Sequence, residues 1–307
     1  MASTTPARAL RWRVWLLAAR PKTLPASLAP VLVGSSLALG AGRFDPAAFA
    51  AALLGALFIQ VGTNLANDYS DARRGADNEQ RIGPLRVTAQ GLVPPRTVLL
   101  GANLAFLLAV LCGIYLIVKA GPLLLAVGGA SIAAGFLYTG GPFPYGYAGL
   151  GEVFVFLFFG LVAVVGSWYV QVQSFPWPAF ALAIPVGLLA AALLVVNNYR
   201  DIDSDRLVDK RTLAVRLGRR RTRRFYLALI ALAYLTLPLA LIGGRVQPWI
   251  LLAFLSLPLA HPPTRTLFAT REGRALNRAL AQTALLQLAF CLLVSAGLLI
   301  GGGLHGR

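Results

Sequence analysis

Asn64-Leu-Ala-Asn-Asp-Tyr-Ser-Asp71 closes a long apolar segment of the chain. Its polar residues fall at positions i, i+3, i+4 and i+7, which is the spacing of one face of an α-helix. Four oxygen-bearing side chains therefore point the same way from an otherwise apolar helix, and they are Asn64, Asn67, Asp68 and Asp71. The stretch predicts a membrane-spanning helix with a polar face at one end.

A second such stretch closes another apolar segment and reads Asn197-Asn-Tyr-Arg-Asp-Ile-Asp-Ser-Asp205. Here Asn197, Asp201 and Asp205 share a helix face at i, i+4 and i+8. The two stretches are alike and four apolar segments apart, which suggests two repeated four-helix units with one further helix added. Such a repeat would bring both polar faces together across a central cavity.

The composition excludes a soluble globular protein. Of 307 residues, 57% are hydrophobic and 13% charged, and the mean hydropathy is +0.70, whereas soluble domains carry about 25% charged residues. The net charge of +17 is typical of nucleic-acid binders, but those are rich in polar surface. We therefore expect no nucleic-acid partner and an all-α, polytopic protein in the lipid bilayer.

Nine apolar segments are long enough to be membrane spans at about 20 residues each. We expect residues 1–307 to form one membrane domain, with a basic N-terminal segment over residues 1–22. The expected spans are 23–42, 47–67, 97–118, 121–139, 149–171, 178–198, 224–243, 247–262 and 279–302.

Positive charge predicts the orientation. With nine spans, 24 of the 28 Lys and Arg residues lie on the side of the N-terminus, and the positive-inside rule places that side in the cytoplasm. Both acidic stretches then face the cytoplasm from the cell membrane.

Eight of the eleven acidic residues belong to two clusters. With oxygen ligands and no nearby Cys or His, Mg²⁺ is favoured over zinc. Basic residues interleave with these acids, as suits a diphosphate. The acids are Asp68, Asp71, Asp77 and Glu79, then Asp201, Asp203, Asp205 and Asp209; the bases are Arg73, Arg74, Arg81, Arg86, Lys210 and Arg211.

Two other interpretations of these acids stay open. The acids could merely balance loop arginines at the membrane surface, or they could belong to a cation-coupled transporter. Transporter acids lie near the bilayer centre, whereas these lie at the cytoplasmic ends of spans, which favours an enzyme.

The chain resembles the intramembrane aromatic prenyltransferases of the UbiA superfamily, and within it the branch that prenylates 1,4-dihydroxy-2-naphthoate. The resemblance covers nearly the whole chain. It rests on residues 64–86, on Pro144–Glu152 with Gly166–Tyr169, on Asn198–Gly218 and on Arg20–Pro25.

The resemblance implies that Mg²⁺ and a polyprenyl diphosphate bind between the two acidic motifs. Implied catalytic and metal-binding residues are Asp68, Asp71, Asp201 and Asp205, with Asp77 as a further metal ligand. Implied substrate-binding residues are Asn64, Asn67, Arg73, Arg81, Arg86, Tyr145, Glu152, Asn198, Arg200 and Lys210. We also expect Tyr138 and Tyr147 to line the cavity or to belong to the interfacial aromatic belt.

The implied reaction transfers the polyprenyl chain to 1,4-dihydroxy-2-naphthoate with loss of CO₂, giving demethylmenaquinone. The sequence departs from the family pattern at two places: the gap from Asp71 to Asp77 is wide, and Asp209 replaces a usual Gly. The basic linker of hydroxybenzoate enzymes is missing, which argues against that acceptor. Another aromatic acceptor, such as homogentisate or haem, is the alternative within the family.

Overall fold

The structure is a computed structural model that describes residues 6–75 and 86–302. All regular structure in these ranges is helical. The N-terminal elements are α1 (Pro6–Ala19), η1 (Pro21–Thr23), α2 (Leu24–Gly40), α3 (Pro46–Arg73), α4 (Pro95–Ala120) and α5 (Leu123–Leu137). They are followed by α6 (Gly151–Val155), η2 (Phe156–Val165), α7 (Gly166–Val172), α8 (Trp177–Arg200), α9 (Ile202–Leu207), α10 (Leu213–Thr236), η3 (Leu237–Leu241), η4 (Pro248–Ala260), α11 (His261–Ala269) and α12 (Gly273–Ile300).

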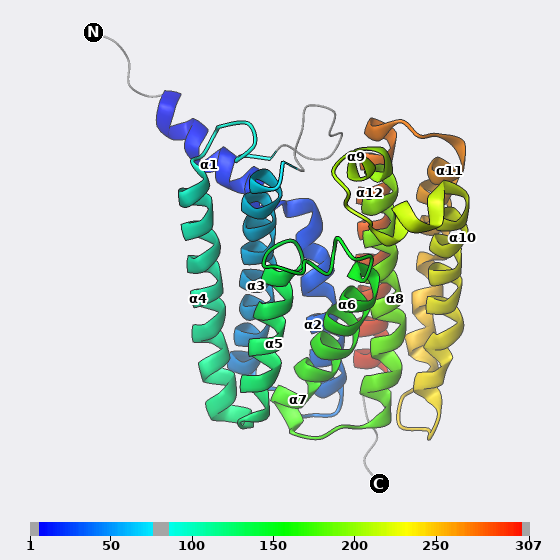
Figure 1. The fold of residues 1–307 in the computed structure, drawn as a ribbon. Helices are drawn as coiled ribbons and strands as arrows, with labels where there is room; N and C mark the ends of the chain where they lie inside the picture. Colours follow the sequence, from blue (N-terminus) through cyan, green and yellow to red (C-terminus); the bar gives the residue numbers. More distant parts are fainter. Residues whose placement is uncertain (1–5, 76–85, 303–307) are drawn as a thin grey trace.

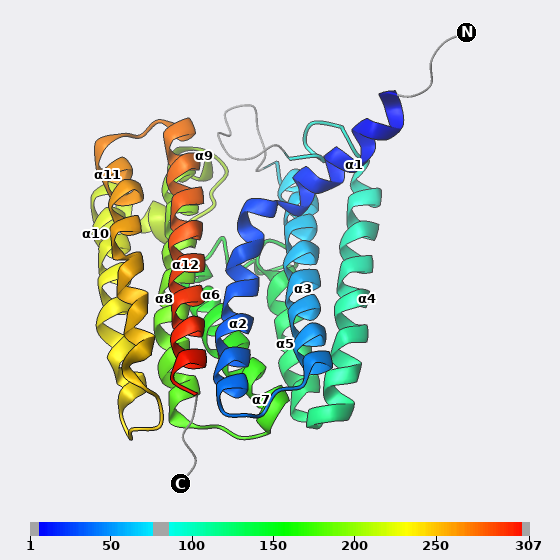
Figure 2. The same ribbon diagram turned by 180° about the vertical axis from the view of Figure 1, so that it is seen from behind.

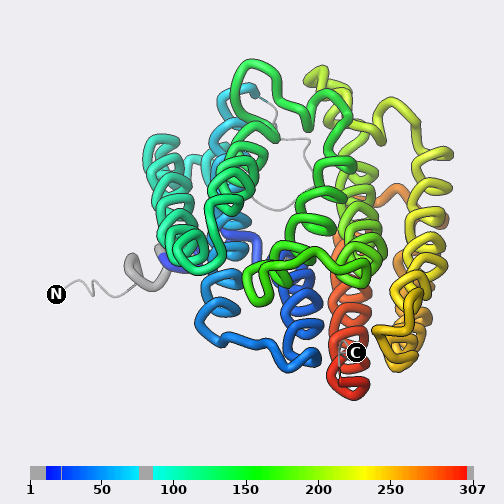
Figure 3. The backbone as a smooth tube through the Cα atoms, turned by 90° about the horizontal axis from the view of Figure 1, so that it is seen from below, coloured from blue at the N-terminus to red at the C-terminus, as the bar shows by residue number. Residues whose placement is uncertain are grey.

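The long helices form one bundle in which they run side by side (Figure 1). From behind, α2 and α12 lie next to each other, and α1 bends away from α2 at one end of the bundle (Figure 2). Along the bundle axis, α3 to α5 gather on one side and α8 to α12 on the other (Figure 3). The ends of α3 and α8 that carry the two acidic stretches lie at the same end of the bundle.

Each predicted apolar segment falls on helical structure, but the prediction of nine crossings is not confirmed. By length and hydropathy, six helices of the described chain can cross a membrane, or up to seven if the bent pair of α1 and α2 is one span. The fourth segment is α5, with 15 residues. The eighth contains the 13-residue 3₁₀ helix η4, which at about 2 Å per residue is longer than an α-helix of equal length.

The core of the bundle surrounds α8. In the most apolar 18-residue stretch of this helix 78% of residues are buried, more than in the corresponding stretch of any other candidate span of the described chain. Its buried side chains pack with those of α2, α10 and α12 in the main apolar cluster. Since α8 carries the second acidic stretch at its end, packing of the core fixes the position of that stretch.

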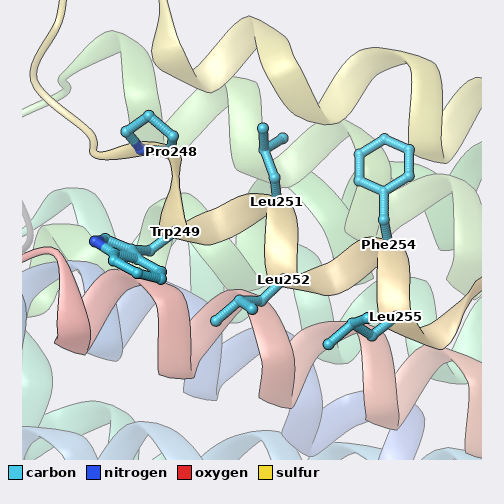
Figure 4. Close-up of a pocket in the computed structure, with 6 residues that line it drawn as sticks. All are labelled: Pro248, Trp249, Leu251, Leu252, Phe254 and Leu255. Atoms are coloured by element: carbon cyan, nitrogen blue, oxygen red, sulfur yellow. The ribbon is translucent and has the colours of Figure 1, made fainter.

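The outer face of η4 is apolar and has a shallow recess (Figure 4). Trp249 and Leu255 are about half and two-thirds exposed there, and η4 packs against α12. Exposed apolar side chains of this kind suit contact with lipid. The recess is lined by Pro248, Trp249, Leu251, Leu252, Phe254 and Leu255.

The π-helix η2 touches its neighbours through glycines. A Cβ atom on Gly34 of α2 would lie 2.2 Å from the carbonyl oxygen of Val164, and one on Gly160 would lie 2.7 Å from Cα of Gly187 in α8. The backbones of α2, η2 and α8 therefore approach closely only because these positions lack side chains.

Gly34→Ala tests this contact. The added methyl group has to push α2 and η2 apart, and we expect a loss of about 1–3 kcal/mol in unfolding free energy, measured by denaturant unfolding in detergent. Gly113→Ala in α4 is the matched control, because a Cβ there meets nothing within 4 Å. Equal stability of the two variants would contradict the close contact.

Candidate active site

The first polar face occupies the last turns of α3 and is buried. Asn64, Asn67, Asp68 and Asp71 are between 1% and 6% exposed. The carboxylate of Asp68 accepts hydrogen bonds from the backbone N–H groups of Val87 at 3.1 Å and Thr88 at 3.0 Å. These bonds tie the segment that begins at residue 86 to the end of α3.

Asp71 forms a buried ion pair. One carboxylate oxygen accepts a hydrogen bond from Nη2 of Arg86 at 2.7 Å, and the other accepts one from the hydroxyl of Tyr147 at 3.0 Å. Arg86 and Asp71 are 6% and 2% exposed. A guanidinium predicted to bind substrate therefore lies directly beside a predicted metal ligand.

The two amides of this face point into a cavity. The hydroxyl of Thr139 donates to Oδ1 of Asn67 at 2.8 Å. Nδ2 of Asn64 donates to the carbonyl oxygen of Ala19 at 2.9 Å, and both Asn64 and Asn67 line the cavity. Thr139 had no distinctive signal in the sequence and was missed by the sequence analysis.

The second polar face follows the end of α8. Arg200 donates two hydrogen bonds to the carboxylate of Asp201, at 2.7 and 2.6 Å, and both residues are buried. Arg200 also donates to Oδ1 of Asn197 and of Asn277, at 2.9 Å each. Asp201 is therefore held by a forked guanidinium that is itself fixed by two amides.

Asp205 lies one turn further on, in α9, and is 7% exposed. Nζ of Lys210 is 3.7 Å from Oδ1 of Asp205, and the backbone N–H of Lys210 donates to the carbonyl oxygen of Asp205 at 2.9 Å. The predicted ligand and the predicted substrate-binding lysine are thus adjacent.

Tyr147 connects the two faces. Its hydroxyl donates to Asp71 of the first face, and Nζ of Lys210 from the second lies 5.1 Å from its ring centroid. Burial, reinforced by the charge of Asp71, raises the pKa of Tyr147 well above its ordinary value. The hydroxyl therefore stays protonated and acts as a donor.

Tyr145, Glu152 and Asn198 belong to the same region. Tyr145 lines the cavity, as does Tyr138, and its hydroxyl donates to the carbonyl oxygen of Ala134 at 2.8 Å. Glu152 is buried at the start of α6, and its Oε1 accepts a hydrogen bond from Nδ2 of Asn198 at 2.9 Å.

Other residues of the acidic and basic clusters lie apart from this buried group. Arg73 is exposed at the end of α3 and donates to the hydroxyl of Tyr69 at 2.9 Å. Asp209 is exposed, has a left-handed backbone with φ 51°, and pairs with Arg211. Asp77 and Arg81 lie outside the described residues.

A cavity of about 480 Å³ extends from the polar faces into the bundle. Its polar end presents amides and hydroxyls, and its walls are apolar side chains and glycines of α2 to α5, η2 and α8. The four buried aspartates of the two faces are not among its lining residues. These aspartates follow the cavity-lining Asn67 and Asn197 along the chain, so they lie nearer the ends of α3 and α8 that lead into the loops.

The donor set fits a hard cation. The buried ligand candidates on the two faces are carboxylate and amide oxygens, and Mg²⁺ prefers oxygen ligands. Within residues 6–75 and 86–302, no three acidic, His or Cys side chains gather in one group.

The family model for the UbiA prenyltransferase family matches residues 27–289. The chain belongs to this family. It is a membrane prenyltransferase, which sets aside the alternative of a transporter.

Relatives within the UbiA family extend over nearly the whole chain. The 1,4-dihydroxy-2-naphthoate octaprenyltransferase of Mycobacterium tuberculosis is 43% identical over 94% of this chain and 97% of its own length. The enzyme of the same name from Escherichia coli is 39% identical over 89% and 91%. A UbiA homolog from Archaeoglobus fulgidus, solved with GPP and Mg²⁺, has the same fold with a TM-score of 0.61, at 16% identity over 92% and 99%.

Asp201→Ala tests the buried ion pair of the second face. Removal of the carboxylate leaves the Arg200 guanidinium buried without its countercharge, and we expect a loss of about 3 kcal/mol in unfolding free energy. Asp209→Asn is the control, because this carboxylate is 81% exposed and Asn tolerates the left-handed backbone, so stability should change by less than about 0.5 kcal/mol. If denaturant unfolding finds equal losses, Asp201 is not part of a buried pair.

Proposed function

We propose that this UbiA-family enzyme transfers a polyprenyl chain from a polyprenyl diphosphate to 1,4-dihydroxy-2-naphthoate, with Mg²⁺ and with loss of CO₂, to give the prenylated diol, which is the reduced (quinol) form of demethylmenaquinone. The observation that carries the proposal is the meeting of two buried Asp/Asn faces at one end of an apolar cavity, linked by Tyr147. The choice of acceptor is supported by the names of the relatives at 43% and 39% identity.

The metal would be held by the acids of both faces. We assign Asp68 and Asp71, with Asp77, from the first face, and Asp201 and Asp205 from the second. When bound, Mg²⁺ neutralises charge on the diphosphate and so assists its departure. The Archaeoglobus fulgidus homolog, solved with GPP and Mg²⁺, supports the choice of Mg²⁺ as the metal.

The basic residues beside these acids bind and orient the diphosphate. Arg86, Arg200 and Lys210 each lie against an aspartate, so their positive charges are already held where negative charge develops on the leaving group. Preorganised charge of this kind stabilises a transition state without reorganisation during the reaction.

The cavity protects the reacting carbon from water. The C–O bond to the diphosphate breaks with its electron pair going to the diphosphate, which leaves an allylic cation. Ring electrons of the acceptor form the new C–C bond at the carbon that bears the carboxylate. The bond to that carboxylate then breaks, its electrons return to the ring and CO₂ leaves, so charge and atoms balance.

The site faces the cytoplasm from the cell membrane in this proposal. The two acidic stretches lie at the same end of the bundle, and 24 of 28 positive residues belong to the side predicted to be cytoplasmic. A charged diphosphate and an aromatic acid can reach such a site from water, while the prenyl chain extends into the apolar part of the cavity.

The direct test of this function supplies purified enzyme with a polyprenyl diphosphate, carboxyl-labelled 1,4-dihydroxy-2-naphthoate and Mg²⁺. We expect prenylated product and labelled CO₂ in equal amounts, and loss of both with EDTA. Asp71→Asn and Asp201→Asn should each lower kcat at least about 100-fold. The exposed Asp203→Asn, whose side chain is 74% exposed, is the control.

Two outcomes would contradict different parts of the proposal. Product that forms in EDTA, or in both aspartate variants, would exclude the metal–diphosphate site. Turnover of another aromatic acid, with none of the naphthoate, would exclude only the acceptor.

The wall of the cavity should limit the length of the prenyl chain that the enzyme accepts. Gly128 of α5 lines the cavity, and a Cβ there meets nothing within 4 Å. Gly128→Phe should therefore place its ring in the cavity and shift the preferred substrate to a shorter prenyl diphosphate. The control Leu107→Phe changes a 54% exposed residue of α4 outside the cavity. An unchanged product length in Gly128→Phe would show that the chain lies elsewhere.

A further inference from the structure

Two arginines of α10 hold their guanidinium groups against one tyrosine. The guanidinium carbons of Arg219 and Arg223 lie 5.2 and 5.5 Å from the ring centroid of Tyr199, which is fully buried near the end of α8. Nε of Arg223 also donates to the Tyr199 hydroxyl at 2.7 Å. The two cations are four residues apart on the same face of α10, where like charges repel each other.

The chain supplies little negative charge to this pair. In the part of the chain that the structure describes, one carboxylate pairs with these arginines: Oδ2 of Asp203 lies 2.6 Å from Nη2 of Arg219. The Asp203 side chain is 74% exposed, whereas that of Arg219 is 16% exposed, and an ion pair open to solvent contributes little. Two partly buried cations therefore share one carboxylate that faces water. Such an excess of held positive charge favours the binding of an anion.

The hydrogen-bonding capacity of the two guanidinium groups is also incompletely used. Nη1 of Arg219 is buried with no hydrogen-bond partner among the described residues. Arg223 uses its Nε for Tyr199, which leaves the two terminal nitrogens of a half-buried side chain to bind a ligand. A guanidinium matches a phosphate with two parallel hydrogen bonds, so a phosphate is the anion that this pair suits.

The pair lies where a membrane helix leaves the hydrocarbon. Residues 225–242 contain no charged side chain, so the part of α10 and η3 that crosses the bilayer begins directly after these arginines. Both α10 and α11 lie at the outer edge of the bundle (Figure 1). Leu227 and Phe268 are 39% and 45% exposed, and Phe268 lies beside Arg223, whose guanidinium carbon is 5.6 Å from its ring centroid. A phosphate-binding pair is thus followed by exposed apolar surface.

We propose that Arg219 and Arg223 bind the phosphate of an anionic phospholipid headgroup, with an acyl chain along Leu227 and Phe268. The order of charged and apolar groups on this surface is the order within a phospholipid at the cytoplasmic leaflet. The site lies on the outside of the bundle and does not depend on which prenyl acceptor the enzyme uses.

A lipid bound here would contact the second acidic stretch from outside. Tyr199 precedes Arg200 and Asp201 in the chain, and its hydroxyl donates to the carbonyl oxygen of Leu267 in α11 at 3.3 Å. The platform on which the arginines lie therefore joins α8, α10 and α11. A phosphate that neutralises the two cations should hold these three helices together, so phospholipid should raise the Tm of the enzyme.

The test measures Kd for dioleoylphosphatidylglycerol on the purified full-length enzyme in detergent, by native mass spectrometry. We expect the double variant Arg219→Gln/Arg223→Gln to weaken the tightest binding about 10- to 100-fold and to remove the rise in Tm. The matched control is Arg220→Gln/Arg224→Gln, which removes the same charge from exposed positions of the same helix. It should change Kd by less than about threefold.

Arg219→Lys/Arg223→Lys keeps the charge and loses the fork, so it should weaken phosphatidylglycerol by about three- to tenfold. This variant carries the test if the glutamine variant does not fold. Equal weakening in the glutamine variant and its control would show a diffuse basic surface and overturn the inference. So would equally tight binding of phosphatidylcholine, or displacement of the lipid by inorganic phosphate or farnesyl diphosphate at the same concentration.

Discussion

Burial of carboxylates at the ends of two membrane helices is the constraint on which the rest of the structure depends. A buried ionised carboxylate is stable only with hydrogen bonds and opposite charge. Asp68 receives two backbone N–H groups and Asp71 receives Arg86 and Tyr147. Asp201 receives Arg200. These bonds hold the loops against the ends of the helices and place arginine side chains beside the carboxylates.

The same constraint separates the site into layers. Charged oxygen atoms and their basic partners lie beside the loops, amides and hydroxyls lie at the end of the cavity, and apolar side chains line the remainder. The order follows the polarity of the proposed substrates, with a diphosphate, an aromatic acid and a prenyl chain in successive layers. Tyr147 links the two acidic faces, because its hydroxyl donates to Asp71 and Nζ of Lys210 lies over its ring.

Much of this arrangement could be predicted from the sequence, because hydropathy and helical spacing are local properties. The helices and the buried faces that end at Asp71 and Asp205 are where the sequence places them. The rotation of each helix depends on tertiary packing, so the sequence did not show that amides rather than carboxylates line the cavity. The π-helix η2, the 3₁₀ helix η4 and the left-handed Arg20 also depend on packing between distant segments. The sequence predicts nine membrane crossings, whereas the described chain has six helices that are long and apolar enough to cross, or seven if the bent pair of α1 and α2 is one span.

The central claim is that both acidic faces act on one metal–diphosphate group. A double-mutant cycle with Asp71→Asn and Asp201→Asn tests it, using Mg²⁺-dependent binding of a prenyl thiodiphosphate as the measurement. We expect the two changes to be coupled by more than about 0.5 kcal/mol in binding free energy, because each removes part of one shared site. Effects that add within about 0.5 kcal/mol would show that the two faces are independent sites.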